Sequence, residues 1–260
     1  MSSRTPGSVR IKDAPHTHCA ECPVRDRALF ENVPLEHLDW TQQFRSNQFI
    51  VRPKHDLLRE GEPAEYVYTL FSGWMIFYKS LPSGKRQILR FALSGDLIGF
   101  QPVLQAPMNY SVRTLTEVEL CAFPRAKLGT MLEERPELAT RLALMNARDA
   151  ALCQHHLLGT GRKSAKERVA FLLLEILYRV RSMGQIMSVH EDGSIDFPVA
   201  QEEIGDAVGL TTVHVNRTLK ELRDEGLVTN NHRRLTVHDE GTLKEIAQFD
   251  PHTVLGHPLL

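Results

Sequence analysis

The sequence predicts an α+β chain in which an antiparallel β-roll comes first, one long helix follows, and a compact helical unit with a β-hairpin comes last. Three observations predict this order. Short β-branched and aromatic runs with Gly/Pro turns fill residues 29–124. After Pro136, apolar residues recur at three- and four-residue intervals. Residues 205–237 then fit two helices joined by a tight turn and followed by two short strands.

The β-roll is predicted from its strands and turns. Four runs are suitable strands: Tyr66–Leu70, Trp74–Lys79, Ile88–Ala92 and Val118–Phe123. Three turn sequences separate them: Ser72-Gly73, Pro82–Lys85 and Ser94–Asp96. Many short strands with such turns indicate a small antiparallel barrel or sandwich.

The long helix carries one apolar stripe that a charged residue interrupts. The stripe consists of Leu138, Leu142, Met145, Asp149, Leu152 and His156. One reading packs this stripe into the core of its own chain. The other makes it the seam of a homodimer, in which two copies of Asp149 face each other and weaken association.

A break between the long helix and the last unit is predicted at Gly159-Thr160-Gly161, which we interpret as a hinge. Ser164 and Glu167 then form a capping box that opens a helix over Val169–Val180. A short helical stretch and a loose tail are expected after Asp239.

The helix pair turns at Gly209-Leu210, and Thr211 is placed to cap the second helix. Gly226 ends that helix. Its inward residues are predicted to be Val213, Val215, Leu219 and Leu222. An ordinary amphipathic helix pair is the alternative interpretation.

The outward residues of the second helix suit the major groove of double-stranded DNA, where Arg pairs with guanine and Asn with adenine. Two apolar runs, Leu227–Thr229 and Leu235–Val237, flank a basic tip and predict a hairpin. Together these elements make a winged helix-turn-helix whose wing contacts phosphate. The predicted DNA-binding residues are Thr211, Thr212, Val213, His214, Asn216, Arg217, Lys220 and Arg233.

Charge and composition limit the possible functions. The net charge is −1, so positive charge is local and favours selective sites over nonspecific coating of nucleic acid. No apolar stretch approaches the roughly 20 residues that cross a bilayer, and the N-terminus lacks a secretory pattern. We expect a cytoplasmic protein with no membrane partner and with reduced thiols.

The order of these units resembles the Crp/Fnr family of bacterial transcription regulators. Residues 87–99 resemble its β-roll signature, and residues 210–220 resemble its recognition helix. The resemblance implies a cyclic-nucleotide-binding-like β-roll and a dimerisation helix. It also implies a homodimer that binds a pseudo-palindromic DNA site and contacts RNA polymerase.

The predicted parts follow from this reading of the chain. They are an N-terminal cysteine-containing segment (1–28), a β-roll sensor domain (29–124), a dimerisation helix with hinge (125–160), a winged helix-turn-helix DNA-binding domain (161–238) and a C-terminal tail (239–260).

Two departures from the family pattern concern ligand and DNA. The cyclic-nucleotide branch has a Glu and an Arg-Ser pair where this chain has Phe100 and Tyr110-Ser111. Without that Arg a cyclic phosphate has no partner, so no cyclic nucleotide is expected. Val213 stands where well-known members carry a Glu that reads cytosine, whereas Arg217 matches their guanine-reading Arg. Thr212 and Val213 are therefore expected to contact a thymine methyl.

The N-terminal cysteines resemble the segment with which oxygen-sensing Fnr-type regulators hold a [4Fe–4S] cluster. Cys19 and Cys22 match two ligands and Cys121 matches the distant one, but a third N-terminal cysteine is absent. The candidate extra ligands are His16, His18 and Asp26.

The alternatives to an oxygen-sensing cluster are tetrahedral zinc or another metal, a metal-free regulator that is constitutive or senses another molecule, and a two-cysteine redox switch. Haem is a further alternative, although His37 and His55 of the β-roll stand in no recognisable haem motif. Cys153 is interpreted as a small packing residue.

An enzyme is not expected, because the chain has no nucleophile–base set, phosphate loop or dinucleotide fingerprint. The remaining class is a ligand-binding β-roll that serves as an interaction scaffold. That reading leaves the exposed polar residues Asn216 and Arg217 without a role.

Overall fold

The computed structural model describes residues 9–13, 16–31 and 33–252. The chain forms two compact units: residues 1–79 with 91–145, and residues 80–90 with 146–260. Each unit has its own core, and each is treated separately below. Among the described residues, no helix is both long enough and apolar enough to cross a membrane.

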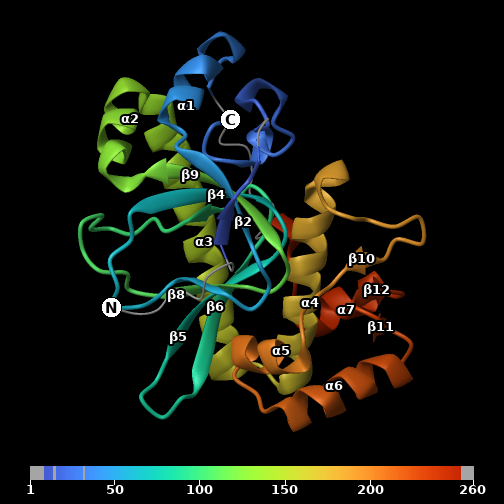
Figure 1. The fold of residues 1–260 in the computed structure, drawn as a ribbon. Coiled ribbons are helices and arrows are strands. Elements are labelled where there is room, and N and C mark those ends of the chain that lie inside the picture. The colour runs from blue at the N-terminus through green and yellow to red at the C-terminus, as the bar shows by residue number, and fades with distance from the viewer. Residues whose placement is uncertain (1–8, 14–15, 32, 253–260) are drawn as a thin grey trace. The chain divides into compact units, whose positions relative to one another are not determined.

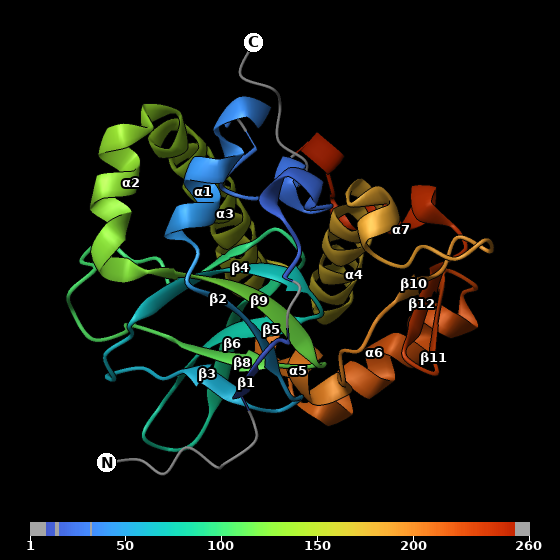
Figure 2. The same ribbon diagram turned by 45° about the horizontal axis from the view of Figure 1, so that its top comes forward.

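The first unit is an antiparallel β-roll, which confirms the predicted fold class (Figures 1 and 2). One sheet has the order β1-β2-β9-β4-β7 and the other the order β3-β8-β5-β6. The strands are β1 (Val9–Ile11), β2 (Asn47–Val51), β3 (Asp56–Leu58), β4 (Tyr66–Ser72), β5 (Met75–Ser80), β6 (Arg86–Ala92), β7 (Leu97–Ile98), β8 (Ser111–Thr114) and β9 (Val118–Pro124). The four predicted strands correspond to β4, β5, β6 and β9.

The turn between β4 and β5 requires glycine. Gly73 has φ +95°, and a Cβ there would lie 2.4 Å from the carbonyl oxygen of Glu117. The predicted Ser72-Gly73 turn therefore has a steric as well as a conformational cause.

Three helices and a series of short 3-10 turns complete the first unit. The helices are α1 (Leu38–Phe44), α2 (Leu128–Glu134) and the first half of α3 (Pro136–Arg162). Both ribbon views place α1 beside α2, and the indole nitrogen of Trp40 donates to Glu134 at 2.5 Å. The 3-10 turns are η1 (Cys19–Glu21), η2 (Arg25–Arg27), η3 (Leu35–His37) and η4 (Arg125–Lys127).

The second unit contains the helix-turn-helix and its wing. Its helices are α4 (Ala165–Ser182), α5 (Gln201–Val208), α6 (Thr212–Asp224) and α7 (Glu240–Ala247), with the 3-10 turn η5 (Gly184–Ile186). A small sheet has the order β10-β12-β11, formed by β10 (Ile195–Asp196), β11 (Val228–Asn231) and β12 (Arg234–Val237). Helix α4 packs against α7, α6 and α5 and is the centre of this core.

The start of α4 is the predicted capping box. The Ser164 hydroxyl accepts from the backbone of Glu167 at 3.3 Å, and the Glu167 carboxylate accepts from the backbone of Ser164 at 2.6 Å. The predicted hinge at Gly159–Gly161 is wrong, because α3 continues through both glycines to Arg162. The chain breaks at Lys163-Ser164 instead, where the cap satisfies the first amides of α4.

Candidate nucleic-acid interface and cysteine pocket

The turn between α5 and α6 depends on two glycines. Gly209 ends α5 in the left-handed conformation with φ +69°. Gly205, inside α5, lets the chain return closely, because a Cβ there would lie 2.6 Å from the carbonyl oxygen of Leu210. The two helices are thereby held at a fixed angle by backbone contact.

One face of α6 is buried and fixes the helix in the unit. Val215, Leu219 and Leu222 are buried, and Thr218 is buried beside them. Thr211 caps the helix by accepting from the His214 amide at 3.3 Å. The expectation that Val213 packs inward is wrong, since its side chain is 81% exposed. Residue 213 lies about 200° around the helix from residue 215, so both cannot face one core.

The opposite face of α6 carries the predicted DNA-reading residues. His214 is half-buried, and the other members are exposed: Thr211, Thr212, Val213, Asn216, Arg217 and Lys220. The Asn216 amide donates to the Gln201 side chain at 3.1 Å. Gln201 therefore belongs to this surface, although its position at the start of α5 gave no signal in the sequence.

The wing is a tight hairpin whose tip is basic. His232 and Arg233 connect β11 to β12 with φ +52° and +62°, the pattern of a type I′ turn. Both side chains are exposed, together with that of Arg234. The carbonyl of Arg233 accepts from the Phe197 amide at 2.7 Å, which anchors the tip to the rest of the unit.

Residues 80–90, which group with this unit, hold α5 from its side. Arg86 contacts the Asp206 carboxylate through Nε and Nη2, both at 2.7 Å. The Gln87 amide donates to the carbonyl of Ala207 at 3.1 Å. These contacts hold the C-terminal end of α5, just before the turn that leads into α6.

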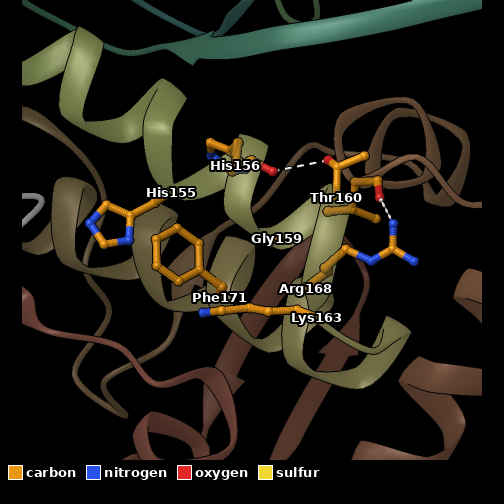
Figure 3. Close-up of a pocket in the computed structure, with 8 residues that line it drawn as sticks. His155, His156, Gly159, Thr160, Lys163, Arg168 and Phe171 are labelled. Carbon is orange, nitrogen blue, oxygen red and sulfur yellow. Dashed lines mark hydrogen bonds between the residues drawn. The ribbon is translucent and has the colours of Figure 1, made fainter.

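The joint between α3 and α4 borders a pocket whose empty space, with the open solvent at its mouth counted in, is about 250 Å³ (Figure 3). Arg168 donates to the carbonyl of Val208 at 2.8 Å, and the Thr160 hydroxyl donates to that of His156 at 2.9 Å. Lys163 donates to the carbonyl of Ala247 at 2.6 Å. The Arg168 and Lys163 bonds connect the junction of α3 and α4 to α5 and α7, whereas the Thr160 bond lies within α3, so the pocket is a structural joint.

The three predicted cysteine ligands line one pocket in the first unit. Cys19 and Cys22 border η1, and Cys121 comes from the middle of β9. The empty space of the pocket, with the open solvent at its mouth counted in, is about 410 Å³. Its other lining residues are Val24, Arg25, Ala28, Phe30, Leu38, Thr41, Arg45, Thr69 and Phe123. The structure thus brings together residues that lie about 100 positions apart in the chain.

Side-chain amides position these thiols. The Gln48 amide donates to the Cys121 sulfur at 3.3 Å, and the Gln42 oxygen accepts from the Cys19 amide at 3.3 Å. Arg45 donates to the carbonyl of Thr17 at 2.6 Å, which holds the segment before Cys19. Gln48 and Cys121 face each other in the β2–β9 register, so the sheet itself sets this geometry.

Burial keeps the three thiols protonated at neutral pH. Burial raises the pKa of the Cys19 thiol to about 11, against the opposing charge of Arg45. Burial also raises the pKa of Cys22 and of Cys121, and for Cys121 the Gln48 hydrogen bond opposes the rise. Protonated thiols are poor nucleophiles, and each must release a proton to bind a metal.

Two hydroxyls in the pocket are buried without partners. Thr41 is 0% exposed and Thr69 is 5% exposed, and the Oγ1 atom of each has no hydrogen-bond partner in the structure. Leaving a buried hydroxyl unpaired costs about 1–3 kcal/mol. The His, Cys, Asp and Glu side chains of the described residues form no group compact enough for a single metal ion.

The predicted extra ligands do not line the pocket. His16 contacts the carbonyl of Lys12 at 2.9 Å, and His18 accepts from the Ala20 amide at 3.2 Å. Asp26 pairs with Arg25 at 3.1 Å. The side chains of His16, His18 and Asp26 are thus engaged outside the cysteine pocket.

The predicted seam of α3 belongs mostly to the interior of its own chain. Leu138, Leu142 and Met145 are in the core of the first unit with Leu128 and Met131. Leu152 is also buried. These four residues are buried within a single chain, as the intramolecular interpretation predicts.

The two polar members of that stripe have partners in the second unit. Asp149 lies 3.5 Å from Arg90 and 3.4 Å from Arg148. His156 lies 2.6 Å from the buried Glu175. Asp149 therefore does not present an uncompensated charge, as the seam hypothesis required.

A different stripe of α3 faces outward. It contains Ala139, Ala143, Asn146, Ala150, Cys153 and Leu157, all exposed. Leu157 is 75% exposed and its neighbour Leu158 is 51% exposed. The spacing alternates between four and three residues, as in a coiled coil. The interpretation of Cys153 as a packing residue is wrong, because its side chain lies on this open face.

Family models match both units of the chain. One described as "Cyclic nucleotide-binding domain" matches residues 48–135, and one described as "Crp-like helix-turn-helix domain" matches residues 167–246. The two matches correspond to the β-roll and to the unit that contains α5, α6 and the wing.

Relatives and a solved structure match most of the chain. The transcriptional activatory protein AadR of Rhodopseudomonas palustris is 32% identical, covering 82% of this chain and 84% of its own length. The nitrogen fixation regulation protein FixK of Bradyrhizobium diazoefficiens is 29% identical, covering 93% and 98%. The structure of FixK2 from Bradyrhizobium japonicum aligns with TM-score 0.69 and 30% identity, covering 76% of this chain and 96% of that one.

Proposed function

Because the chain belongs to the Crp/Fnr family of DNA-binding transcription regulators, we propose that it binds a pseudo-palindromic site as a homodimer and responds to oxygen or redox state. The proposed sensor is the pocket of Cys19, Cys22 and Cys121. The observation that carries this proposal is the gathering of all three thiols around one pocket that has two unpaired hydroxyls. The relatives named above are regulators, and the chain is not an enzyme.

The DNA-reading residues are proposed from the exposed face of α6. Arg217 is exposed and suits the two acceptors of a guanine, while Thr212 and Val213 present methyl groups to a thymine. Arg233 at the wing tip suits a phosphate and adds affinity without sequence preference. We expect a second subunit to place an identical helix one turn of DNA away. Contact with RNA polymerase remains an expectation from the family.

Homodimerisation is proposed through the outward stripe of α3. Small side chains at Ala139, Ala143 and Ala150 allow two helices to approach closely, and the exposed Leu157 supplies apolar area. Asn146 provides a polar pair that fixes the register of the two copies. A parallel second copy is the occupant that a two-fold symmetric DNA site requires.

The cysteine pocket is the proposed place of an iron–sulfur cluster. Cys19, Cys22 and Cys121 would be its ligands, and Arg25 and Arg45 line the same pocket. When bound, a [4Fe–4S] cluster would supply chemistry that oxygen destroys. The residues of the chain would bind it and exclude water through Phe30, Leu38 and Phe123.

The cysteine segment is tied directly to the helix proposed for dimerisation. Arg141 in α3 donates to the carbonyls of Ala28 and Arg27 at 3.3 and 3.2 Å, and pairs with Glu31 at 2.6 Å. If residues 19–31 become more or less ordered, the change therefore acts on α3 beside its outward stripe. This connection is the proposed route from the sensor to dimer stability.

A cyclic nucleotide is not part of the proposed function. Tyr110 stands where the family's phosphate-binding Arg would be, and its hydroxyl donates to the carbonyl of Phe100 at 2.7 Å. The Tyr110 ring lies 5.0 Å from that of Phe77. The position is thus occupied by an aromatic group that brings no positive charge.

Anaerobic purification tests the sensor. Protein kept free of air is expected to contain about equal iron and sulfide and to be brown, and to lose both on exposure to air. Fluorescence anisotropy with a duplex library should show salt-sensitive, sequence-preferring binding that weakens after air exposure. If the anaerobic protein is colourless and its DNA affinity does not change on exposure to air, the protein is a metal-free regulator.

A further inference from the structure

One side-chain contact joins the first helix of the helix-turn-helix to the exposed face of the second. Helices α5 and α6 pack side by side, as both ribbon views show (Figures 1 and 2). The Asn216 side chain of α6 is exposed, and its amide nitrogen donates to the side-chain oxygen of Gln201 at 3.1 Å. Gln201 is the first residue of α5 and is half-buried. A residue of α5 thus holds one of the residues proposed to read a base.

The backbone sets the position of Gln201 relative to Asn216. At the start of α5, the Glu203 carboxylate accepts from the Ala200 amide at 2.7 Å, which fixes the turn that carries Gln201. Two glycines close the turn after α5, so the angle between α5 and α6 is also fixed. The Gln201 side chain therefore stays within reach of Asn216.

The hydrogen bond leaves Asn216 with the two groups that pair with adenine. A carboxamide carries one oxygen acceptor and two N–H donors. Gln201 takes one of the two N–H donors of Asn216. The other N–H and the oxygen can then pair with N7 and the N6 amino group of adenine in the major groove.

Holding the amide also affects which base Asn216 can read. Guanine offers two acceptors in the major groove, whereas adenine offers one acceptor and one donor. A freely rotating amide can turn its N–H groups toward guanine. An amide whose nitrogen is kept toward Gln201 has its oxygen at a fixed point, where it accepts from adenine but meets an acceptor of guanine. The contact should therefore favour adenine over guanine.

We propose that Gln201 is a positioning residue for base recognition, because its side-chain oxygen orients the Asn216 amide toward adenine. Gln201 touches no base in this arrangement, and its effect on DNA recognition passes through Asn216. The inference rests on the proposed reading of DNA by α6 and is independent of any cofactor in the cysteine pocket.

The test uses the full chain and the duplex that it prefers in the library, with single-base variants across one half-site. Anisotropy titrations give the affinity for each duplex, and the base preference is the ratio of two affinities. Asn216→Ala should lower the preference for adenine at one base pair about fivefold or more, which identifies the position that Asn216 reads.

Variants at position 201 then test the positioning role. Gln201→Met removes the acceptor and should lower the adenine preference at that base pair about two- to tenfold, the size of one neutral hydrogen bond. Preferences at the other base pairs should stay unchanged. Gln201→Leu is a second variant without an acceptor and should give the same result, and thermal melting checks that each variant is folded.

The matched control is Gln201→Glu, which keeps an oxygen acceptor and should retain the adenine preference. Its negative charge should weaken binding to every duplex similarly, and the ratio of affinities removes this effect. In the Asn216→Ala background, Gln201→Met should cause no further change in base preference. A further change there would mean that Gln201 contacts the DNA itself, and the inference would be wrong.

Three other outcomes would overturn the inference. If Gln201→Met leaves the adenine preference unchanged, Asn216 does not need Gln201. If Gln201→Glu loses the preference as fully as Gln201→Met, an acceptor at position 201 is not the cause. If Asn216→Ala changes no preference while Arg217→Ala does, the proposed reading of DNA stands and the role of Gln201 fails. If neither of these two variants changes any preference, the proposed reading fails as well.

Discussion

At the scale of single residues, the side chains proposed to read DNA are exposed in the protein alone. Val213 shows why, since a valine that is 81% exposed contributes nothing to the core. Its presence on the face shared with Arg217 is understandable if a thymine methyl covers it in the complex.

Replacing Arg217 by alanine is therefore expected to weaken binding to the preferred site by roughly 1–3 kcal/mol and to relax preference at one base pair. Anisotropy titrations against single-base variants of the site measure this. Arg233→Ala is the matched comparison. It should weaken binding to all DNA sequences similarly, and it should reduce the slope of log affinity against log salt concentration by about one. Equal losses on every sequence for Arg217→Ala would contradict base reading.

A buried ionic group in the second unit makes stability depend on pH. Glu175 is 1% exposed and Arg179 is 3% exposed, and Glu175 contacts both Arg179 and His156. Burial acts to lower the pKa of His156, but the charge and hydrogen bond of Glu175 outweigh it and raise that pKa. Burial acts to raise the pKa of Glu175, but His156 and Arg179 outweigh it and lower that pKa.

These directions fix the pH range of maximal stability. The His156 contribution is complete below the unfolded pKa of about 6.5 and is lost as pH rises through the raised folded value. The Glu175 contribution is complete above the unfolded pKa of about 4.3 and is lost as pH falls through the lowered folded value. Stability should thus peak between about pH 4.3 and 6.5 for this pair.

Urea unfolding at several pH values measures the effect, and His156→Gln should flatten the decline on the alkaline side. The uncharged amide of glutamine keeps a hydrogen-bond donor near Glu175 but does not titrate. Identical pH profiles for the variant and the wild type would show that the pair does not control stability.

At the scale of elements, α3 presents two stripes that differ by one residue in phase. Leu138, Leu142 and Met145 enter the core because they are large and apolar, whereas Ala139, Ala143 and Ala150 remain outside. The sequence pattern predicts the helix correctly, but the spacing rule alone does not distinguish a core stripe from a seam. Side-chain size decides which face of α3 the β-roll covers. Alanine is only weakly apolar, so a stripe of alanines is hard to recognise from hydrophobic periodicity.

Cys153 supplies a direct test of the outward stripe. In a parallel pair the same residue meets itself across the two-fold axis, so two copies of Cys153 approach each other. Diamide should then join them into a covalent dimer, taking two electrons and two protons from the thiols. Non-reducing electrophoresis detects the product, and Cys153→Ser should abolish it. Cross-linking that persists in Cys153→Ser would place another cysteine at the interface.

The contact of residues 86–87 with α5 is a second element-scale feature. Arg86 and Asp206 are both largely shielded from solvent, with side chains 16% and 23% exposed. A double-mutant cycle with Arg86→Ala and Asp206→Ala should give a coupling energy of about 1 kcal/mol in the free energy of unfolding. Strictly additive effects would mean that the pair contributes nothing to the position of α5.

At the scale of the whole molecule, much of the fold is predictable from local chemistry. The capping box at Ser164, the turn at Gly209 and the basic tip at Arg233 each have a cause within a few residues, and each is observed. The cysteine pocket is different, because the sheet pairs residue 121 with residue 48 and no local pattern reports that. The cysteines could be grouped only by resemblance, and Thr41 and Thr69 gave no signal.

The same reason explains the error at residues 159–161. Two glycines separated by one residue resemble a hinge, but a helix tolerates glycine where tertiary contacts hold it. Lys163 and Arg168 provide such contacts just after the glycines, by donating to the carbonyls of Ala247 and Val208. Tertiary contacts therefore keep these residues helical despite the two glycines, and such contacts cannot be predicted from the local sequence.

The absence of room for a side chain at Gly205 has a consequence for genetics. Selections for loss of regulation should recover substitutions there as often as at Arg217, although a side chain at residue 205 would meet only Leu210 and Val215 of the same unit. Purified Gly205→Ala should melt at a lower temperature, whereas Arg217→Ala should melt like the wild type. A mutational map scored only by promoter output would not distinguish the two positions. Thermal melting would distinguish them, because only the substitution at Gly205 should destabilise the fold.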